Sequence, residues 1–169
     1  MSYQEHQTQS RGQSARCAII TLSDTRTADT DTSGKKIFTL LQEQGHTIAE
    51  THLIKDDPMQ LRALLDQLLM TKEIDVILTN GGTGISRRDQ TIHVIEEVID
   101  TPLPGFGELF RMLSYQQIGS GAMLSRALGG IAKGKLLFAM PGSTGAVELA
   151  MTKLILPELG HLLRELLKH

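Results

Sequence analysis

The sequence predicts an α/β fold of three layers, in which helices cover both faces of a mostly parallel, doubly wound sheet. Short apolar runs alternate with amphipathic helical patterns in the first half of the chain, and this order is typical of parallel sheets with right-handed crossovers. The loops that follow these runs are rich in glycines, hydroxyls and carboxylates. Such loops are expected where ligands bind at the carboxyl ends of parallel strands.

The first two strands are expected over residues 16–22 and 47–54. Between them, the side-chain oxygens of residues 31–33 can cap a helix, which Gly45 would end. A second helix opens at Pro58, where acids precede the first helical position. Its apolar face has helical spacing and comprises Leu61, Leu64, Leu65, Leu68 and Leu69.

The third strand, residues 75–78, leads into the glycine-rich segment 79–91 and a helix over residues 92–99. The second half is less regular. Prolines and glycine within residues 102–105 break the chain before a helix marked by Phe106, Leu109, Phe110 and Leu113.

Two further strands are expected over residues 126–132 and 135–140, joined at Lys133-Gly134 by a two-residue hairpin. One more helix follows residues 141–143, and the last one starts at Pro157. If the strand over 135–140 is parallel to the others, the loop after it lies at the same edge as the glycine-rich segment.

The chain has 169 residues without a repeat or linker, and we expect a single domain over residues 15–169. Residues 1–14 are polar and include four glutamines. This composition predicts a disordered tail and excludes a signal peptide.

Composition excludes several partners and sites. A net charge of −2 and a pI of about 6.3 argue against nucleic-acid binding, and no apolar stretch approaches the ~20 residues of a membrane span. Cys17 is the only cysteine, which excludes an intrachain disulfide. Within an apolar run it is expected to be an inert, buried thiol in a protein of the reducing cytoplasm. The two common glycine-rich nucleotide fingerprints are also absent.

The glycine-rich segment has the composition of an anion site. Gly81, Gly82 and Gly84 leave the backbone bare between a strand and a helix, so that a ligand can approach the N–H groups. Asp89 follows two arginines at the far end. A carboxylate there suits Mg²⁺, which shares oxygen ligands with phosphates. The alternative is that Asp89 caps the next helix.

Asp56 is the second acid singled out, because two carboxylates from neighbouring loops could hold Mg²⁺ beside phosphates. Helix capping is the alternative, and Asp57 competes for either role. Asp24 lies in the first loop, where a solvated turn is the simpler interpretation.

Hydroxyls and arginines offer further anion contacts. Ser143 and Thr144 follow Pro141-Gly142 and either bind an oxo-anion or cap the helix that begins there. The arginines that could neutralise a polyanion, or simply lie on the surface, are Arg87, Arg88 and Arg126.

Together these segments resemble the MoaB/Mog family of molybdopterin-binding proteins in molybdenum cofactor biosynthesis. The motifs that support the resemblance span about residues 16–160: Thr21-Leu22-Ser23-Asp24 with Asp31-Thr32-Ser33-Gly34; Thr79-Asn80-Gly81-Gly82-Thr83-Gly84 with Arg88-Asp89-Gln90-Thr91; Gly105-Phe106-Gly107-Glu108-Leu109-Phe110-Arg111; Leu124-Ser125-Arg126-Ala127; and Met140-Pro141-Gly142-Ser143.

The resemblance implies a molybdopterin-binding fold and, in active members, transfer of an adenylyl group from Mg-ATP to the phosphate of molybdopterin, with release of pyrophosphate. Asp89 and Asp56 would then be the catalytic, magnesium-binding acids, and Ser143 would contact the pterin side. The other ligand-binding positions implied are Ser23, Asp24, Gly81, Gly82, Thr83, Gly84 and Arg88.

The resemblance leaves the activity open. The Gly105–Arg111 segment is of the MoaB type, and residues 141–144 lack the Pro-Gly-x-Pro of Mog-type members. An adenylyltransferase is the leading interpretation, and a non-catalytic molybdopterin carrier is the alternative. A scaffolding module is disfavoured because the chain shows no second domain. A homotrimer or homohexamer is expected on family grounds, with Phe106, Phe110 and Leu113 either at its interface or in the core.

Overall fold

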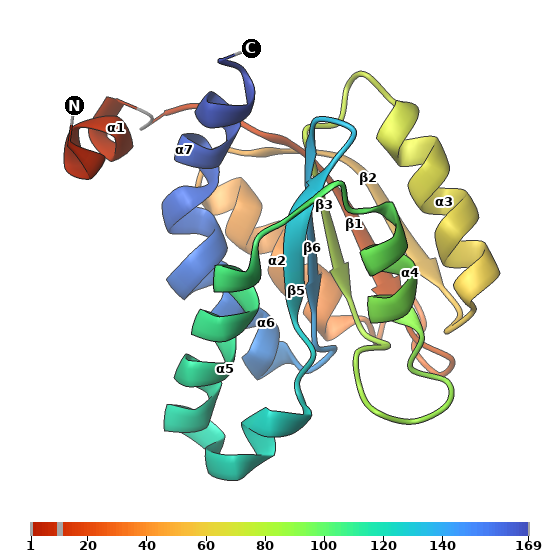
Figure 1. Cartoon of the computed structure of the whole chain (residues 1–169). Helices are drawn as coiled ribbons and strands as arrows, with labels where there is room; N and C mark the ends of the chain where they lie inside the picture. Colours follow the sequence, from red (N-terminus) through yellow and green to blue (C-terminus); the bar gives the residue numbers. More distant parts are fainter. Residues whose placement is uncertain (1, 10–11, 169) are drawn as a thin grey trace.

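The computed structural model describes residues 2–9 and 12–168. A six-stranded sheet, in the order β2-β1-β3-β6-β5-β4, lies between two layers of helices (Figure 1). Four strands run parallel: β1 (Arg16–Leu22), β2 (Thr47–Ile54), β3 (Val76–Asn80) and β6 (Lys135–Met140). The prediction of a three-layer, mostly parallel α/β fold is confirmed.

The other edge of the sheet is antiparallel. β5 (Leu128–Ala132) pairs with β6, and the two-residue β4 (Thr101–Pro102) pairs with β5. The hairpin between β5 and β6 turns at Lys133 and Gly134, whose φ angles of 47° and 74° are both positive. Positive φ at both positions is typical of the type I′ turn that matches the twist of paired strands.

The helices fall into two groups with separate apolar cores. One face of the sheet is covered by α2 (Thr32–Glu43), α5 (Pro104–Ile118), α6 (Thr144–Ala150) and α7 (Leu156–Leu166). The other face is covered by α3 (Pro58–Met70) and α4 (Thr91–Val98). Alternate residues of the buried strands enter opposite cores, as the two-residue repeat of a strand requires.

The last two predicted helices are continuous in the structure. A π-helical turn, η2 (Met151–Ile155), joins α6 to α7. The predicted start of the last helix at Pro157 agrees with α7, because proline occupies its first turn, where it is tolerated. A 3₁₀ segment, η1 (Gly119–Leu124), extends α5.

The amino-terminal segment differs from the predicted disordered tail. Residues 3–9 form α1 (Tyr3–Gln9), while residues 1, 10 and 11 lie outside the described residues. Tyr3 provides the contact: its hydroxyl donates to Glu158, and its ring lies 5.7 Å from that of His161, centroid to centroid. Contacts of this kind, between a tyrosine and polar residues of α7, leave no apolar pattern in the sequence.

The burial of Cys17, Phe106 and Phe110 tests two predictions made from the sequence. Cys17 is buried, and burial raises the pKa of its thiol to about 12, as expected for an inert cysteine. Phe106 and Phe110 are 8% and 1% exposed and lie in the core rather than at an interface. No helix within residues 2–9 and 12–168 is long and apolar enough to cross a membrane.

Candidate functional site

Loops from distant parts of the sequence meet at the carboxyl ends of the parallel strands (Figure 1). β1, β3 and β6 are neighbours in the sheet and run in one direction, so the loops that follow them lie together. β2 adds its own loop at the edge. This arrangement confirms that the loop after β6 joins the glycine-rich segment.

The glycine turn needs its glycines because the backbone is crowded there. Gly81 and Gly82 have φ angles of 97° and 66°. A Cβ on Gly81 would lie 2.2 Å from the carbonyl oxygen of Leu22, and one on Gly82 would lie 2.1 Å from Oγ1 of Thr91. A side chain at either position would overlap these atoms, so both positions favour glycine.

The turn also presents free hydrogen-bond donors. The amide of Gly81 donates to the carbonyl of Met140 at 3.1 Å, and so Gly81 supplies no free N–H group. Within the described chain, none of the four amides of residues 82–85 donates a hydrogen bond. Consecutive free N–H groups at such a turn are suited to bind an anion.

Asp89 does not cap the following helix. Gln90 holds the N-cap position of α4 and makes no side-chain cap hydrogen bond. Asp89 instead accepts from Ser86 within its own loop, with 2.9 Å from the Ser86 amide to Oδ2 and 2.6 Å from the hydroxyl to the same oxygen. The capping alternative is therefore wrong for Asp89, and its carboxylate faces the glycine loop, where a Cβ on Gly84 would lie 2.7 Å away.

The competition between Asp56 and Asp57 is settled by the start of α3. Asp57 is the N-cap, and its Oδ1 accepts from the amides of Met59 at 2.8 Å and Gln60 at 3.4 Å. Asp56 is left free of that role, and its Oδ1 is buried with no hydrogen-bond partner in the described chain. The same oxygen would lie 3.1 Å from a Cβ on Gly82, so Asp56 adjoins the glycine turn.

Three carboxylates share this region. The amide of Asp56 donates to Oδ1 of Asp24 at 3.2 Å. Burial raises the pKa of Asp56, the charges of Asp24 and Asp89 raise it further, and Arg88 opposes them. Such a crowd of like charges favours a bound cation.

Arg88 lies in the site but is paired with an acid. Its Nη2 is 2.6 Å from Oδ2 of Asp24, and Lys55 donates to the carbonyl of Asp24 at 3.0 Å. Asp56, Arg88 and Thr91 line one common recess. The arginine thus places a positive charge beside the carboxylates.

Ser23 and Ser143 serve the local backbone. The hydroxyl of Ser23 accepts from the amides of Thr25 at 3.2 Å and Arg26 at 3.0 Å, which closes the first loop. Ser143 caps α6 by accepting from the amide of Ala146 at 3.2 Å. The capping interpretation of Ser143 is therefore confirmed.

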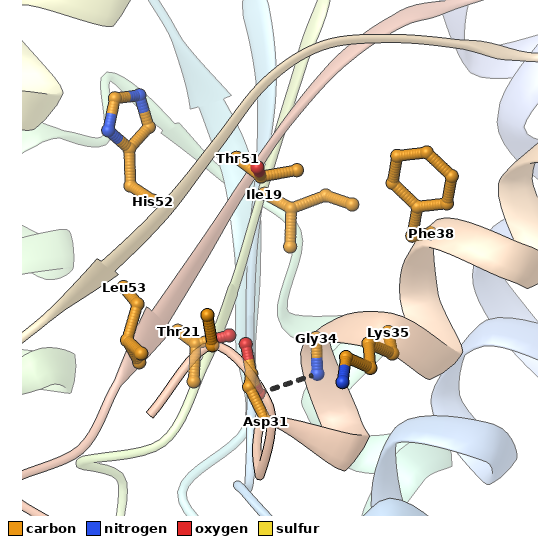
Figure 2. Close-up of a pocket in the computed structure, with 10 residues that line it drawn as sticks. Ile19, Thr21, Asp31, Gly34, Lys35, Phe38, Thr51, His52 and Leu53 are labelled. Atoms are coloured by element: carbon orange, nitrogen blue, oxygen red, sulfur yellow. Dashed lines mark hydrogen bonds between the residues drawn. The ribbon is translucent and has the colours of Figure 1, made fainter. Parts of the chain in front are cut away.

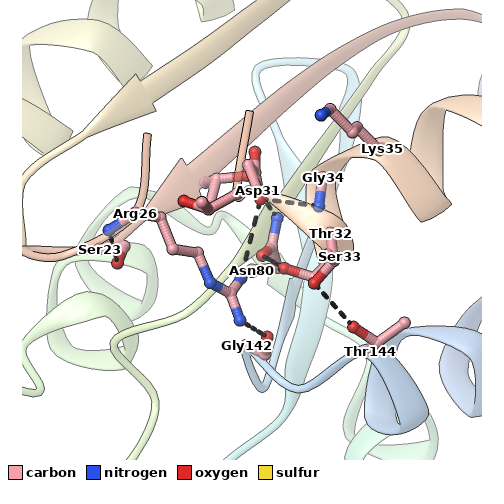
Figure 3. Close-up of polar contacts among 12 residues, drawn as sticks. Ser23, Arg26, Asp31, Thr32, Ser33, Gly34, Lys35, Asn80, Gly142 and Thr144 are labelled. Carbon is pink, nitrogen blue, oxygen red and sulfur yellow. Dashed lines mark hydrogen bonds and ion pairs between the residues drawn. The ribbon is translucent and has the colours of Figure 1, made fainter. Parts of the chain in front are cut away.

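A buried polar network joins the first loop to the loop after β6 (Figure 3). Arg26 donates to the carbonyl of Gly142 at 2.8 Å and to the hydroxyl of Ser33. Ser33 in turn donates to Oδ1 of Asn80 at 2.7 Å, and Asn80 donates to Oγ1 of Thr21 at 3.0 Å. The roles of Arg26, Ser33 and Asn80 were not predicted from the sequence. The one signal in the sequence was a polar residue, Asn80, at the end of an otherwise apolar strand, which indicates a buried hydrogen-bonding group.

A cavity of about 320 Å³ opens beside this network, between α2 and strands β1 and β2 (Figure 2). Ile19, Phe38 and Leu53 give it apolar walls, and Asp31 and Lys35 lie near its polar end. None of the three clustered carboxylates lines this cavity. The cavity is therefore separate from the clustered carboxylates beside the glycine turn.

The donor set fits Mg²⁺ only together with a ligand. Within the described residues no three His, Cys, Asp or Glu side chains are arranged to hold a metal ion by themselves. The orphaned Oδ1 of Asp56 and the carboxylate of Asp89 are nevertheless oxygen ligands beside an anion-binding turn. Mg²⁺ commonly takes one or two carboxylates and completes its shell with substrate phosphates and water.

Comparison with known proteins extends over nearly the whole chain. Residues 18–161 match the family described as "Probable molybdopterin binding domain". Molybdenum cofactor biosynthesis protein B of Halalkalibacterium halodurans is 50% identical over 169 residues, which cover 99% of each chain. A crystal structure of a molybdenum cofactor biosynthesis protein B superposes with a TM-score of 0.89 at 52% identity, covering 91% of this chain and 96% of that one. The crystal structure of the tungsten cofactor synthesizing protein MoaB from Pyrococcus furiosus superposes with a TM-score of 0.81 at 33% identity, covering 90% of this chain and 97% of that one.

Proposed function

This chain belongs to the molybdopterin-binding family that includes molybdenum cofactor biosynthesis protein B, and on that premise we propose that it adenylylates molybdopterin with Mg-ATP. One observation supports this proposal above the others. Within the described chain the amides of residues 82–85 donate no hydrogen bond, and at Gly82 this turn adjoins the buried Oδ1 of Asp56, which has no hydrogen-bond partner there. A site of this kind suits a polyphosphate and its cation together.

In the proposed reaction, an oxygen of the terminal phosphate of molybdopterin attacks the α-phosphorus of ATP. A new P–O bond forms, the bond between the α-phosphorus and its bridging oxygen breaks, and pyrophosphate leaves with the electron pair. Catalysis of such a transfer depends on in-line positioning and charge neutralisation rather than on a covalent intermediate. The amides of Gly82, Thr83 and Gly84 would hold phosphate oxygens in line.

Asp56 and Asp89 are the residues that would hold Mg²⁺. When bound, the cation neutralises charge that builds up on the phosphate oxygens. Asp56 fits this role because its oxygen is already desolvated, and Asp89 because Ser86 fixes its orientation. Arg88 would leave Asp24 and turn to the phosphates, since its side chain is 67% exposed and water screens the present ion pair.

A molybdopterin carrier without turnover is the second candidate. The Arg88–Asp24 ion pair favours it, because this contact supplies positive charge to the acids without any metal. Both functions use the same loops and differ in whether ATP is consumed.

Purified protein mixed with molybdopterin, ATP and Mg²⁺ distinguishes the two functions. Adenylylated molybdopterin and pyrophosphate formed in equal amounts, over many turnovers, would support the enzyme. Tight molybdopterin binding without either product would support the carrier, and addition of EDTA to the active mixture checks the dependence on metal.

We also propose that the chain assembles as a homotrimer or homohexamer through the exposed face of α5. Leu109, Met112, Tyr115 and Ile118 recur at three-residue intervals and are 48–65% exposed. Exposed apolar stripes of this kind are typical of protein interfaces. Sedimentation velocity should report a trimer or hexamer that Met112→Glu dissociates. Met59→Glu is the control, because Met59 is 80% exposed on α3; a wild-type monomer would contradict the proposal.

A further inference from the structure

The guanidinium of Arg126 binds the backbone of the glycine-rich loop. Its Nε donates to the carbonyl of Thr83 at 3.2 Å, and its Nη2 donates to the carbonyl of Asp89 at 2.8 Å and to that of Gly84. The half-buried guanidinium therefore joins the two ends of the segment 83–89, from a position two residues before β5. The sequence offered Arg126 as a group that neutralises a polyanion, whereas the structure engages it with carbonyls.

The charge of Arg126 is not cancelled by a partner. All of its hydrogen bonds go to backbone carbonyls, and within the described chain no carboxylate forms an ion pair with it. By contrast, Arg88 on the same loop is neutralised by Asp24. A guanidinium that is satisfied by carbonyls keeps its full charge beneath the loop.

Two of the three bonded carbonyls, those of Thr83 and Gly84, belong to peptide units whose amides are free, whereas the Asp89 carbonyl shares its peptide with the amide of Gln90, which donates to the carbonyl of Arg88 at 2.9 Å. The carbonyl of Thr83 shares its peptide with the amide of Gly84, and that of Gly84 with the amide of Ile85. Neither amide donates within the described chain. A cation at the carbonyl end polarises each peptide and turns its N–H end to the opposite side, where an anion would sit.

We propose that Arg126 is a positioning residue of the phosphate site, which sets the anion affinity of the Gly84 and Ile85 amides and fixes Asp89 without touching the ligand. The inference rests on the proposed function for the identity of the anion. Its geometry requires a planar fork of donors, which a lysine ammonium does not provide. Arg126→Lys therefore keeps the charge but loses the grip on both ends of the loop.

The first test needs no ligand. Amide hydrogen exchange is measured for Ser86, Asp89 and Thr91, whose N–H groups donate within this turn. Arg126→Ala and Arg126→Lys should both lose protection at these amides. Arg62→Ala is the matched control, because Arg62 is an exposed arginine on α3, and it should keep that protection.

The second test uses pyrophosphate with Mg²⁺ and measures its Kd by calorimetry. Arg126→Ala should bind roughly 10- to 100-fold more weakly, as expected when hydrogen bonds to a charged group are lost. Millimolar guanidinium should restore affinity to Arg126→Ala, and methylammonium should not. A variant that is merely less stable would lose binding sites and retain the affinity of those that remain.

Two results would overturn the inference: unchanged loop protection in Arg126→Ala, or wild-type affinity for pyrophosphate in a folded Arg126→Ala protein. The proposed function fails separately, if wild-type protein binds neither Mg-ATP nor pyrophosphate. In that case loss of protection in Arg126→Ala would still support Arg126 as the residue that fixes the loop, and the phosphate part of the inference would be overturned.

Discussion

The two ends of the parallel sheet differ in how their charged groups are paired. At the amino end, Arg16 and Asp75 form a bidentate pair, with 3.0 Å from Nε to Oδ2 and 2.8 Å from Nη2 to Oδ1. Lys135 lies beside them and donates to the carbonyls of Thr71 and Ile74 at 2.8 and 2.5 Å. Arg16 and Asp75 neutralise each other, Lys135 lies within the field of the Asp75 charge, and Arg16 lowers the pKa of Asp75.

At the carboxyl end, like charges are crowded and donors are left free. Asp56 has a raised pKa and a buried oxygen without a partner, and the amides of residues 82–85 donate to nothing in the described chain. Groups left in this state reduce stability unless a ligand satisfies them. The amino end therefore stabilises the fold, whereas the carboxyl end has the unsatisfied groups that the proposed function assigns to ligand binding.

The largest effect is expected from Asp89→Asn. The asparagine oxygen still accepts from the Ser86 amide, so the loop should keep its shape and molybdopterin should bind as before. Loss of the negative charge should lower turnover about 10²- to 10³-fold. Asp66→Asn, an exposed position on α3, serves as the control. Wild-type turnover in Asp89→Asn would remove this residue from the mechanism.

The next largest effect is a loss of stability, and it should differ between two glycines that both have positive φ. Gly81→Ala places a Cβ 2.2 Å from a backbone oxygen, whereas Gly45 has a φ of 79° and nothing within 4 Å of the added atom. Gly81→Ala should reduce the free energy of unfolding by about 3 kcal/mol or more. Gly45→Ala, which bears only the conformational strain, should cost about 1 kcal/mol. Urea denaturation measures both, and equal costs would refute the argument from close approach.

Asp75→Asn probes the paired end of the sheet. Because the pKa of Asp75 is lowered in the folded state, its stabilisation is present above the unfolded pKa and is lost as the pH falls through the folded one. Arg16 is half exposed, so water screens the pair, and the loss at pH 7 should be only about 0.5–1 kcal/mol. Thermal melts from pH 2 to pH 7 should show the difference vanish at the acid end. Turnover should not change.

The smallest effect on stability is expected from Asp56→Asn, which should stabilise the folded state rather than destabilise it. The raised pKa of Asp56 means that the folded state binds its proton more tightly than the unfolded state does. The resulting penalty appears as the pH rises through the folded pKa and is fully present at neutral pH. Asp56→Asn should therefore raise the melting temperature by about 1–3 °C at pH 7, and by nothing at pH 3, while turnover falls. A lower melting temperature at pH 7 would contradict the crowding of charge.

Much of the fold could be predicted because it depends on local patterns. The bounds expected for β1, β2 and β6 agree with the structure, since each is an apolar or alternating run between turn signals. The π-helical turn and β4 could not be predicted, because the first retains a helical pattern and the second has only two residues.

The sequence predicted which residue types form the candidate site, but it did not predict their hydrogen-bond partners. The acids and glycines followed from the strand–turn–helix pattern, but Asp56 and Asp57 are adjacent and chemically alike. Only the geometry of the first turn of α3 assigns the cap to Asp57. Arg26 and Arg126 bond to carbonyls 116 and 37–43 residues away, and no local pattern indicates such a contact.

The most direct test of the account is pyrophosphate release in the presence of molybdopterin and ATP, titrated with Mg²⁺, for one variant from each end of the sheet. We expect release that depends on Mg²⁺ and matches adenylylated molybdopterin in amount, retained in Asp75→Asn and lost in Asp89→Asn. No release from folded wild-type protein that binds molybdopterin, or equal loss in both variants, would contradict the assignment of the carboxyl end as the site of adenylyl transfer.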